Sequence, residues 1–227
     1  MTKALFWDFH GTLTTANHLW SGSIYKAFSS IAPNLNISLD LCRSFTCNGF
    51  TWDSPDIDYI DKINDKWWDT TLDMFYKKFI NSNIDINIAK QVCSILPSII
   101  QDVNNYELYP DAIETLKQVM EKGYENYLLS NNYPELDDIM DKLGLSQYFN
   151  GSIISAKVGY EKPRPEIYDI ALKLANNPDT SYMIGDSLRA DIEGGHNAKM
   201  KTILVHNNTP SNADYSFNDL ISIVSIL

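Results

Sequence analysis

Short apolar runs alternate with segments of helical spacing through the second half of the chain. With one more run near the N-terminus, there are five such runs, at 3–7, 126–129, 152–155, 181–184 and 201–205. The segments between the later runs have apolar residues at helical spacing and Pro or Gly at their ends, namely 111–120, 134–143 and 165–174. This alternation is typical of a parallel sheet covered by helices on both faces. The pattern therefore predicts an α/β fold around a five-stranded parallel sheet.

The segment between the first two apolar runs breaks this rhythm. It is rich in Trp, Tyr and Phe, has no convincing alternating strand, and contains helical candidates at 21–30, 59–80 and 86–100. A long helical insertion after a first strand is typical of a separate lid or cap domain. We therefore predict a core domain formed by 1–14 and 106–227, and an all-helical cap domain formed by 15–105.

Composition narrows the class of protein. A content of 44% hydrophobic residues over 227 positions can fill a core, which excludes a disordered chain. The formal charge of −11, without a local basic patch, makes nucleic acid an unexpected partner. The N-terminal apolar run soon meets Asp8, so no signal peptide or membrane span is predicted and the expected compartment is the cytoplasm. Cys42, Cys47 and Cys93 lack metal-ligand spacing and indicate free thiols.

Polar residues follow four of the predicted strands, at the carboxyl edge where open parallel sheets gather reactive groups. These four tips are 8–13 (DFHGTL), 130–132 (SNN), 159–163 (GYEKP) and 185–191 (GDSLRAD). Asp8 is the candidate nucleophile, because a carboxylate can attack phosphorus and form an acyl phosphate that water then cleaves. Asp8 and Asp186, with a backbone carbonyl and waters, offer the hard oxygen ligands that Mg²⁺ prefers. Ser130 and Lys162 could stabilise the transition state, and glycines at 11 and 185 permit close backbone approach.

At these residues the chain resembles the haloacid dehalogenase (HAD) superfamily, in the subgroup with a helical cap inserted after the first motif. The family pattern D-x-D-G-T-[LV] is matched by 8–13 except at position 10, its Ser/Thr by Ser130, its lysine by Lys162, and its G-D-[ST]-x-x-x-D by 185–191. The resemblance implies a Rossmann-like core and a Mg²⁺-dependent phosphatase that hydrolyses small phosphorylated metabolites through an aspartyl phosphate on Asp8.

The resemblance also implies a set of site residues. Mg²⁺ is expected on Asp8, on the main-chain carbonyl of His10 and on Asp186, with Asp191 supporting the metal shell. The expected catalytic residues are Asp8, His10 and Lys162. The residues expected to bind substrate are Gly11, Thr12, Ser130, Asn131 and Lys162. The sequence predicts neither the identity of the metabolite nor the oligomeric state.

His10 occupies the position where most phosphatases of the family have a second aspartate. An imidazole with an ordinary pKa near 6.5 could protonate a leaving alkoxide and then deprotonate water, so we interpret His10 as the acid and base. The position tracks reaction type in the family, which leaves three alternatives: a phosphonatase, a 2-haloacid dehalogenase, or a catalytically weakened binding protein. The intact Asp186 favours a metal-dependent reaction over the metal-free dehalogenase.

Aromatic and basic residues of the predicted cap are candidates for substrate contact. Arg43 is the only arginine of the insertion, and we interpret it as a surface residue. Trp52, Trp67 and Trp68 are interpreted as part of the core of the cap rather than as a platform for stacking a nucleobase.

Overall fold

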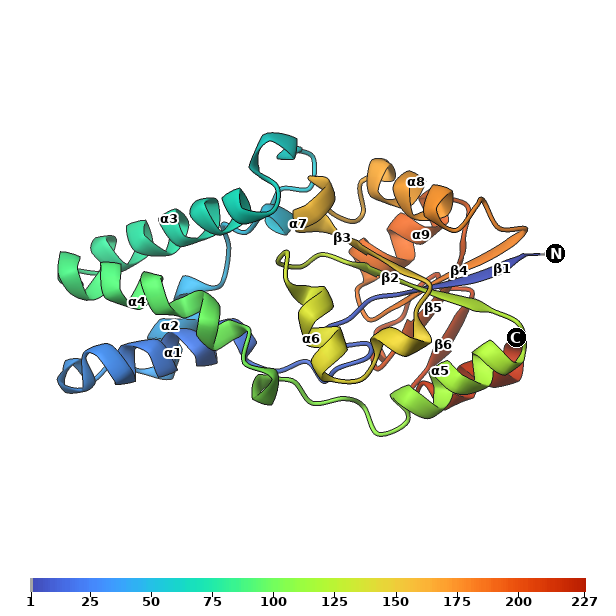
Figure 1. The fold of residues 1–227 in the computed structure, drawn as a ribbon, viewed down its shortest axis with the longest axis horizontal. Helices are drawn as coiled ribbons and strands as arrows, with labels where there is room; N and C mark the ends of the chain where they lie inside the picture. The colour runs from blue at the N-terminus through green and yellow to red at the C-terminus, as the bar shows by residue number, and fades with distance from the viewer. Residues whose placement is uncertain (1) are drawn as a thin grey trace.

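The computed structural model describes residues 2–227, and its centre is a six-stranded parallel sheet (Figure 1). The strands lie in the order β3-β2-β1-β4-β5-β6. Their bounds are β1 Lys3–Trp7, β2 Glu125–Ser130, β3 Gly151–Ile154, β4 Thr180–Gly185, β5 Lys201–Val205 and β6 Tyr215–Phe217. The predicted α/β fold is confirmed, and the sheet has one strand more than the five expected. β6 has only three residues, none of them fully buried, and so lacked an apolar run in the sequence.

β1 lies in the middle of the sheet, and this position decides where Asp8 emerges. Trp7 is in register with Leu128 of β2 on one side and with Ile184 of β4 on the other. The backbone N–H of Asp8 then donates to the carbonyl of Ile184 at 2.9 Å. Asp8 therefore leaves the sheet at its carboxyl edge, next to the strand pair where the chain order reverses, which is the usual place of ligand sites in open α/β sheets.

Helices cover both faces of the sheet, as Figure 1 shows. Successive residues of β1 point to opposite faces: Phe6 packs in one buried cluster with Ile167, while Trp7 packs in another with Leu116. The helices of the core are α5 Ala112–Glu121, α6 Leu136–Lys142, α7 Ser155–Val158, α8 Pro165–Leu174 and α9 Gly194–Asn197. A π-helical turn, η6 Leu188–Glu193, precedes α9, and a 3₁₀ segment, Ile221–Ile226, packs near α5. Because both faces are covered, the strands read as continuous apolar runs.

The insertion between β1 and β2 forms a helical cap that projects from the carboxyl edge of the sheet (Figure 1). Its α-helices are α1 Leu19–Ile31, α2 Leu39–Phe45, α3 Asp65–Asn81 and α4 Ile86–Ile100. The segment between α2 and α3, residues 46–64, is mostly irregular and contains the short turns Thr51–Asp53 and Ile60–Lys62. We call residues 46–64 the cap loop.

One predicted helix begins later than expected. Residues 59–80 have helical spacing, but α3 starts at Asp65. The backbone N–H groups of Tyr59 and Asn64 donate to carbonyls of Gly159 and Ala156 in the core, at 3.0 and 2.9 Å. These contacts hold the first residues of the predicted helix against the core, which local periodicity does not reveal.

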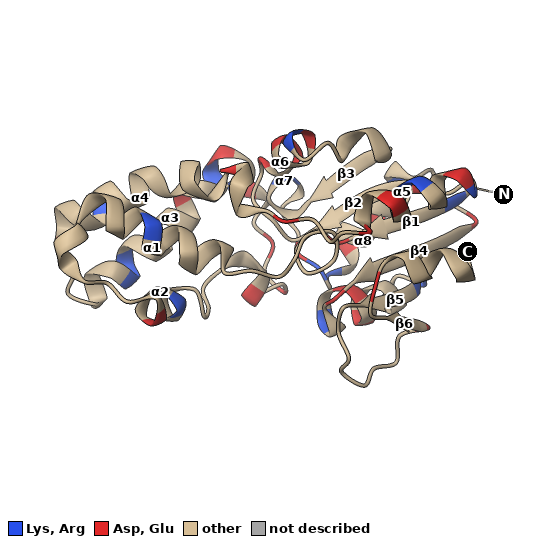
Figure 2. Ribbon diagram, turned by 90° about the horizontal axis from the view of Figure 1, so that it is seen from below, with Lys and Arg blue, Asp and Glu red and all other residues tan. Residues whose placement is uncertain are grey.

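Two chain segments that lie side by side join the cap to the core. The N–H of Thr15 donates to the carbonyl of Glu107 at 2.8 Å, and the N–H of Tyr109 donates to the carbonyl of Leu13 at 3.0 Å. The domain limits of 1–14, 15–105 and 106–227 fall at this pair of segments and remain a prediction. Basic residues are dispersed among acidic ones over the described ribbon (Figure 2). None of the helices of residues 2–227 is long and apolar enough to cross a lipid bilayer.

Candidate active site

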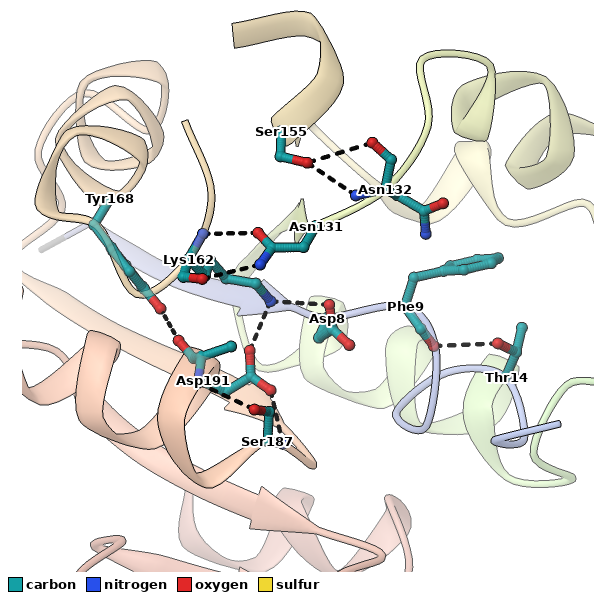
Figure 3. Close-up of polar contacts among 11 residues, drawn as sticks. Asp8, Phe9, Thr14, Asn131, Asn132, Ser155, Lys162, Tyr168, Ser187 and Asp191 are labelled. Atoms are coloured by element: carbon teal, nitrogen blue, oxygen red, sulfur yellow. Dashed lines mark hydrogen bonds and ion pairs between the residues drawn. The ribbon is translucent and has the colours of Figure 1, made fainter. Parts of the chain in front are cut away.

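Lys162 lies between two carboxylates at the carboxyl edge of the sheet (Figure 3). Its Nζ donates to Oδ1 of Asp8 at 2.9 Å and to Oδ1 of Asp191 at 2.6 Å. The side chain is only 1% exposed. Burial alone lowers the pKa of Lys162, but the charges of Asp191 and Asp8 outweigh it and raise the pKa above its ordinary value. The ammonium is therefore held charged and oriented beside the candidate nucleophile.

Three aspartates form an acidic cluster around the end of β1. Asp8, Asp186 and Asp191 each offer a carboxylate oxygen within 4.8 Å of the other two. Burial, and then the charges of Asp8 and Asp191, raise the pKa of Asp186 to about 7. Burial likewise raises the pKa of Asp191 to about 6, against the opposite influence of Lys162. Three close carboxylates with one ammonium lack compensating positive charge, which a divalent cation would supply.

Glycines allow the backbone to approach this cluster. A Cβ at Gly11 would collide with Oδ2 of Asp186, and a Cβ at Gly185 would collide with Oδ2 of Asp191. Gly11 also has φ +79°, which favours glycine. The close approach and the hard oxygen donors fit a small cation such as Mg²⁺.

A cavity of about 250 Å³ opens above Lys162. Its lining contains six of the residues predicted for the site, namely Asp8, His10, Ser130, Asn131, Lys162 and Asp191. Asp186 lies beside it as part of the acidic cluster. The structure thus brings together residues from four chain segments that the motifs had marked.

Asn131 lines the cavity but directs its amide to the main chain of Lys162. Its Oδ1 accepts from the N–H of Lys162 at 2.7 Å, and its Nδ2 donates to the carbonyl of Lys162 at 3.0 Å (Figure 3). Asn131 therefore fixes residues 159–163, which we call the lysine loop, against the end of β2. Ser130, the last residue of β2, is 1% exposed beside it.

Gly11 and Thr12 lie in a tight turn after Asp8 and are not part of the cavity lining. The N–H of Gly11 donates to the carbonyl of Thr14 at 2.8 Å, so it is engaged within the turn. Thr12 is buried, and its hydroxyl has no hydrogen-bond partner among residues 2–227. A phosphate contact from these two residues remains a prediction.

His10 is held by residues that connect the core to the cap. Its Nδ1 lies 3.3 Å from Oγ1 of Thr14, and its ring stacks on Tyr106 with centroids 5.6 Å apart. Its buried Nε2 has no partner within the described chain. Burial lowers the pKa of His10 to about 4, although the charge of Asp8 acts in the opposite direction. The imidazole is therefore neutral at neutral pH, in contrast to the ordinary titration expected from the sequence.

Trp52 reaches the cavity from the cap loop. Its ring stacks on Phe50 at 4.3 Å, and the residue is half-buried. The interpretation of Trp52 as core of the cap was therefore incomplete, because one of its surfaces faces the site. Trp67 and Trp68 are 1% and 8% exposed, as predicted for residues of the cap core.

Glu161 is a buried carboxylate next to Lys162 that the sequence analysis did not assign. Its Oε1 accepts hydrogen bonds from Oγ1 of Thr51 and from the hydroxyl of Tyr59, both at 2.5 Å. Burial raises the pKa of Glu161 above its ordinary value, partly offset by hydrogen bonds from Thr51, Tyr59 and Ser155. Since Thr51 and Tyr59 belong to the cap loop, Glu161 links the cap to the lysine loop of the core. In the sequence, only its position next to Lys162 could have indicated that Glu161 lies near the site.

A parallel sheet with an acidic cluster and a buried lysine at its carboxyl edge, beneath a helical insert, defines a capped, Rossmann-like α/β fold. Residues 2–199 match the haloacid dehalogenase-like hydrolase family. The chain belongs to this family, which confirms the resemblance seen in the motifs.

Curated relatives match part of the chain. The pyrimidine 5'-nucleotidase YjjG of Escherichia coli is 32% identical over 120 residues, which cover 52% of this chain and 47% of the relative. A glyceraldehyde 3-phosphate phosphatase of Methanopyrus kandleri is 32% identical over 99 residues, which cover 43% of this chain and 42% of the relative. The chain thus spans about half the length of the curated relatives it matches.

Solved structures match the whole chain. The magnesium-bound HAD hydrolase YfnB of Bacillus subtilis has a TM-score of 0.79 at 17% identity, covering 100% of this chain and 98% of the other. A 2-haloacid dehalogenase of Pseudomonas syringae has a TM-score of 0.71 at 18% identity, covering 100% and 98%. At these identities, the similarity establishes the fold of core and cap.

Proposed function

We propose that the protein is a Mg²⁺-dependent phosphatase that hydrolyses small-molecule phosphate monoesters through an aspartyl phosphate on Asp8. The observation that carries the proposal is the contact of Lys162 with Asp8 and Asp191 in the lining of one cavity, beside the cluster that includes Asp186. A nucleophilic carboxylate, a fixed cation and a set of hard oxygen donors are the parts that phosphoryl transfer requires.

In the first step the carboxylate of Asp8 attacks phosphorus, a bond forms between its oxygen and phosphorus, and the bond to the leaving oxygen breaks. The leaving oxygen takes up a proton. Lys162 orients Asp8 and balances the negative charge on the phosphoryl oxygens. In the second step a water oxygen attacks phosphorus and the water loses a proton. The bond between phosphorus and the oxygen of Asp8 breaks, which releases inorganic phosphate and the free carboxylate of Asp8.

His10 is the proposed carrier of these protons, because it lines the cavity and its buried Nε2 is unpartnered within residues 2–227. A neutral imidazole can accept a proton from the attacking water. A phosphate dianion in the cavity would raise the pKa of His10 by charge attraction, which would also favour the protonated ring needed for the leaving group.

Asp8, Asp186 and the main-chain carbonyl of His10 are the proposed holders of Mg²⁺, with Asp191 in support. When bound, the ion neutralises charge on the transferring group and holds it for in-line displacement. The buried acidic cluster, with the pKa of Asp186 raised to about 7, supports a site built for a cation.

The relatives support a phosphate monoester as substrate, since their names describe a 5'-nucleotidase, a glyceraldehyde 3-phosphate phosphatase and, in Thermus thermophilus, a phosphoserine phosphatase. A phosphonatase would need a lysine of the cap to form an imine with the aldehyde. Lys162, from the core, is the only lysine in the described lining of the cavity. The geometry therefore favours hydrolysis of a phosphorus–oxygen bond.

Turnover of p-nitrophenyl phosphate with and without Mg²⁺ tests the proposal. We expect Asp8→Asn to lower kcat/KM by more than about 10³-fold, because the variant lacks the nucleophile. The matched control is Asp137→Asn, which changes a partly exposed carboxylate paired with Lys157. Wild-type turnover that needs no metal, or Asp8→Asn turnover close to wild type, would contradict the proposal.

A further inference from the structure

Arg189 lines the same cavity as Asp8 and Lys162. It lies in η6, between the end of β4 and Asp191, and the residue is exposed. Arg189 falls within the last motif, 185–191, and no role was predicted for it. Its guanidinium adds a positive charge to a chain whose formal charge is −11.

The other two arginines of the chain are paired with carboxylates. Arg43 donates to Asp40 at 2.7 Å, and Arg164 lies 2.9 Å from Glu166. The main-chain carbonyl of Arg189 accepts from the N–H of Gly194, but its guanidinium has neither a hydrogen bond nor an ion pair with any residue of 2–227. An unpaired guanidinium at the site can accept an anionic partner.

The acidic residue nearest in sequence is already engaged. Oδ1 of Asp191 accepts from Lys162 at 2.6 Å, and its Oδ2 accepts from the N–H of Ser187 at 3.0 Å. Asp191 therefore has little capacity left to neutralise Arg189. Lys162, in turn, is occupied by Asp8 and Asp191. Of the two cations in the described lining, Arg189 is the one without a protein partner.

The volume and the lining of the cavity limit the kind of anion that Arg189 can bind. At about 250 Å³ it has room for a phosphoryl group and a small leaving group. Trp52 lines the cavity from the cap and presents an apolar surface to the carbon skeleton of that group. A guanidinium binds carboxylate or phosphate in a bidentate manner, which suits a second anion on the leaving group.

We propose that Arg189 binds a second anionic group of the substrate, so that the preferred phosphate monoester carries a carboxylate or a second phosphate on its leaving group. This inference rests on the proposed phosphatase function and narrows its substrate class. It differs from a role for Arg189 in holding the transferring phosphoryl group, because that role would act on every phosphate monoester alike.

Matched substrate pairs test the inference. Phosphoglycolate and 2-hydroxyethyl phosphate differ by a carboxylate in place of a hydroxymethyl group, and propane-1,3-diol bisphosphate and its monophosphate differ by one phosphate. We expect wild type to prefer the member with a second anionic group in at least one pair. Whether the preference appears in the phosphoglycolate pair or in the bisphosphate pair distinguishes a carboxylate from a phosphate as that group. Arg189→Gln should lower kcat/KM for that substrate about 10- to 100-fold, mainly through KM, with less than about 3-fold change for its partner. Arg189→Lys should recover part of the loss.

Arg43→Gln is the control, because it removes an exposed arginine of the cap. Equal losses on both members of a pair, or no loss on either, would overturn the inference.

Calorimetric titration of Asp8→Asn protein with the same compounds, with and without Arg189→Gln, gives a second readout that does not need turnover. Equal affinities in that titration would also overturn it. If Asp8→Asn loses the turnover that wild type shows while Arg189→Gln affects both members of each pair equally, the phosphatase function stands and this inference fails.

Discussion

Nζ of Lys162 donates to Oδ1 of Asp8 at 2.9 Å, although the two residues are 154 positions apart in the sequence. The contact orients the candidate nucleophile within the folded protein itself. A second bond from Lys162 to Asp191 extends the arrangement into the acidic cluster. Catalysis gains from such preorganised charge, because the site need not rearrange as the transition state forms.

Removal of the lysine is therefore expected to affect both stability and activity. In Lys162→Met, the buried Asp191 and the partly buried Asp8 lose their compensating charge. We expect the free energy of unfolding to fall by about 3 kcal/mol and kcat/KM to fall by at least about 10²-fold. Urea unfolding and steady-state kinetics measure the two effects.

The matched control for this change is Lys157→Met, which removes a partly exposed ion pair with Asp137. That variant should change the free energy of unfolding by less than about 1 kcal/mol. A Lys162→Met protein as stable as this control would show that the buried contacts do not act as described.

Glu161 gives a prediction for stability against pH. Burial raises its pKa in the folded protein, so the folded state favours the neutral carboxyl. The contribution of Glu161 to the free energy of unfolding is most favourable below its ordinary pKa. That contribution is lost as the pH rises through the pKa that Glu161 has in the folded protein. Glu161→Gln keeps an oxygen acceptor for Thr51 and Tyr59 without the charge. The variant should gain stability relative to wild type as the pH rises from 5 to about 8.

Urea unfolding of both proteins at the two pH values measures this difference. The other titratable groups are common to both proteins, so their contributions to the pH dependence of the free energy of unfolding cancel in the comparison. A Glu161→Gln variant that loses stability relative to wild type as the pH rises would reverse the expected sign and contradict the assignment.

Binding of Mg²⁺ should also depend on pH. The pKa of Asp186 is raised to about 7 and that of Asp191 to about 6, so protons compete with a cation for these carboxylates. We expect Mg²⁺ to bind up to about 10-fold more weakly at pH 6 than at pH 8, with proton release on binding. Calorimetric titration at the two pH values, after removal of metal with a chelator, measures this.

Asp186→Asn is the informative variant for this prediction. It removes one titrating ligand, so both the affinity and its dependence on pH should diminish. Affinity for Mg²⁺ that is the same at pH 6 and pH 8 in wild type would argue against these aspartates as ligands.

The sequence predicted the helix spans that are set by residues at the helix ends, and the edge of the sheet at which the site lies. The spans of α4 and α8 match the predicted 86–100 and 165–174, where Asp85 caps one helix and Pro165 begins the other. The four strand tips were predicted to meet, because strands of a parallel sheet end at one edge. The ion pair between Lys162 and Asp8 was not itself predicted, although both residues were expected at that edge.

The features that the sequence missed depend on contacts between cap and core. The start of α3, the exposure of Trp52 to the cavity and the role of Glu161 all arise where the cap loop meets residues 156–161. Those partners lie about 100 residues away along the chain, for example 110 positions between Thr51 and Glu161. Periodicity and motif spacing carry no information on such pairs. The lowered pKa of His10 was missed for the same reason, because it follows from burial in the folded chain.

Asp8 is expected to become phosphorylated during turnover. Borohydride reduces an acyl phosphate to an alcohol, which would convert a phosphorylated Asp8 to homoserine. Wild-type protein turning over a phosphate monoester with Mg²⁺ is quenched into borohydride, and the peptide that contains residue 8 is analysed by mass spectrometry. We predict homoserine at position 8 only when substrate and Mg²⁺ are both present. Turnover with an unchanged Asp8 and modification at another residue would contradict the assignment of Asp8 as the nucleophile.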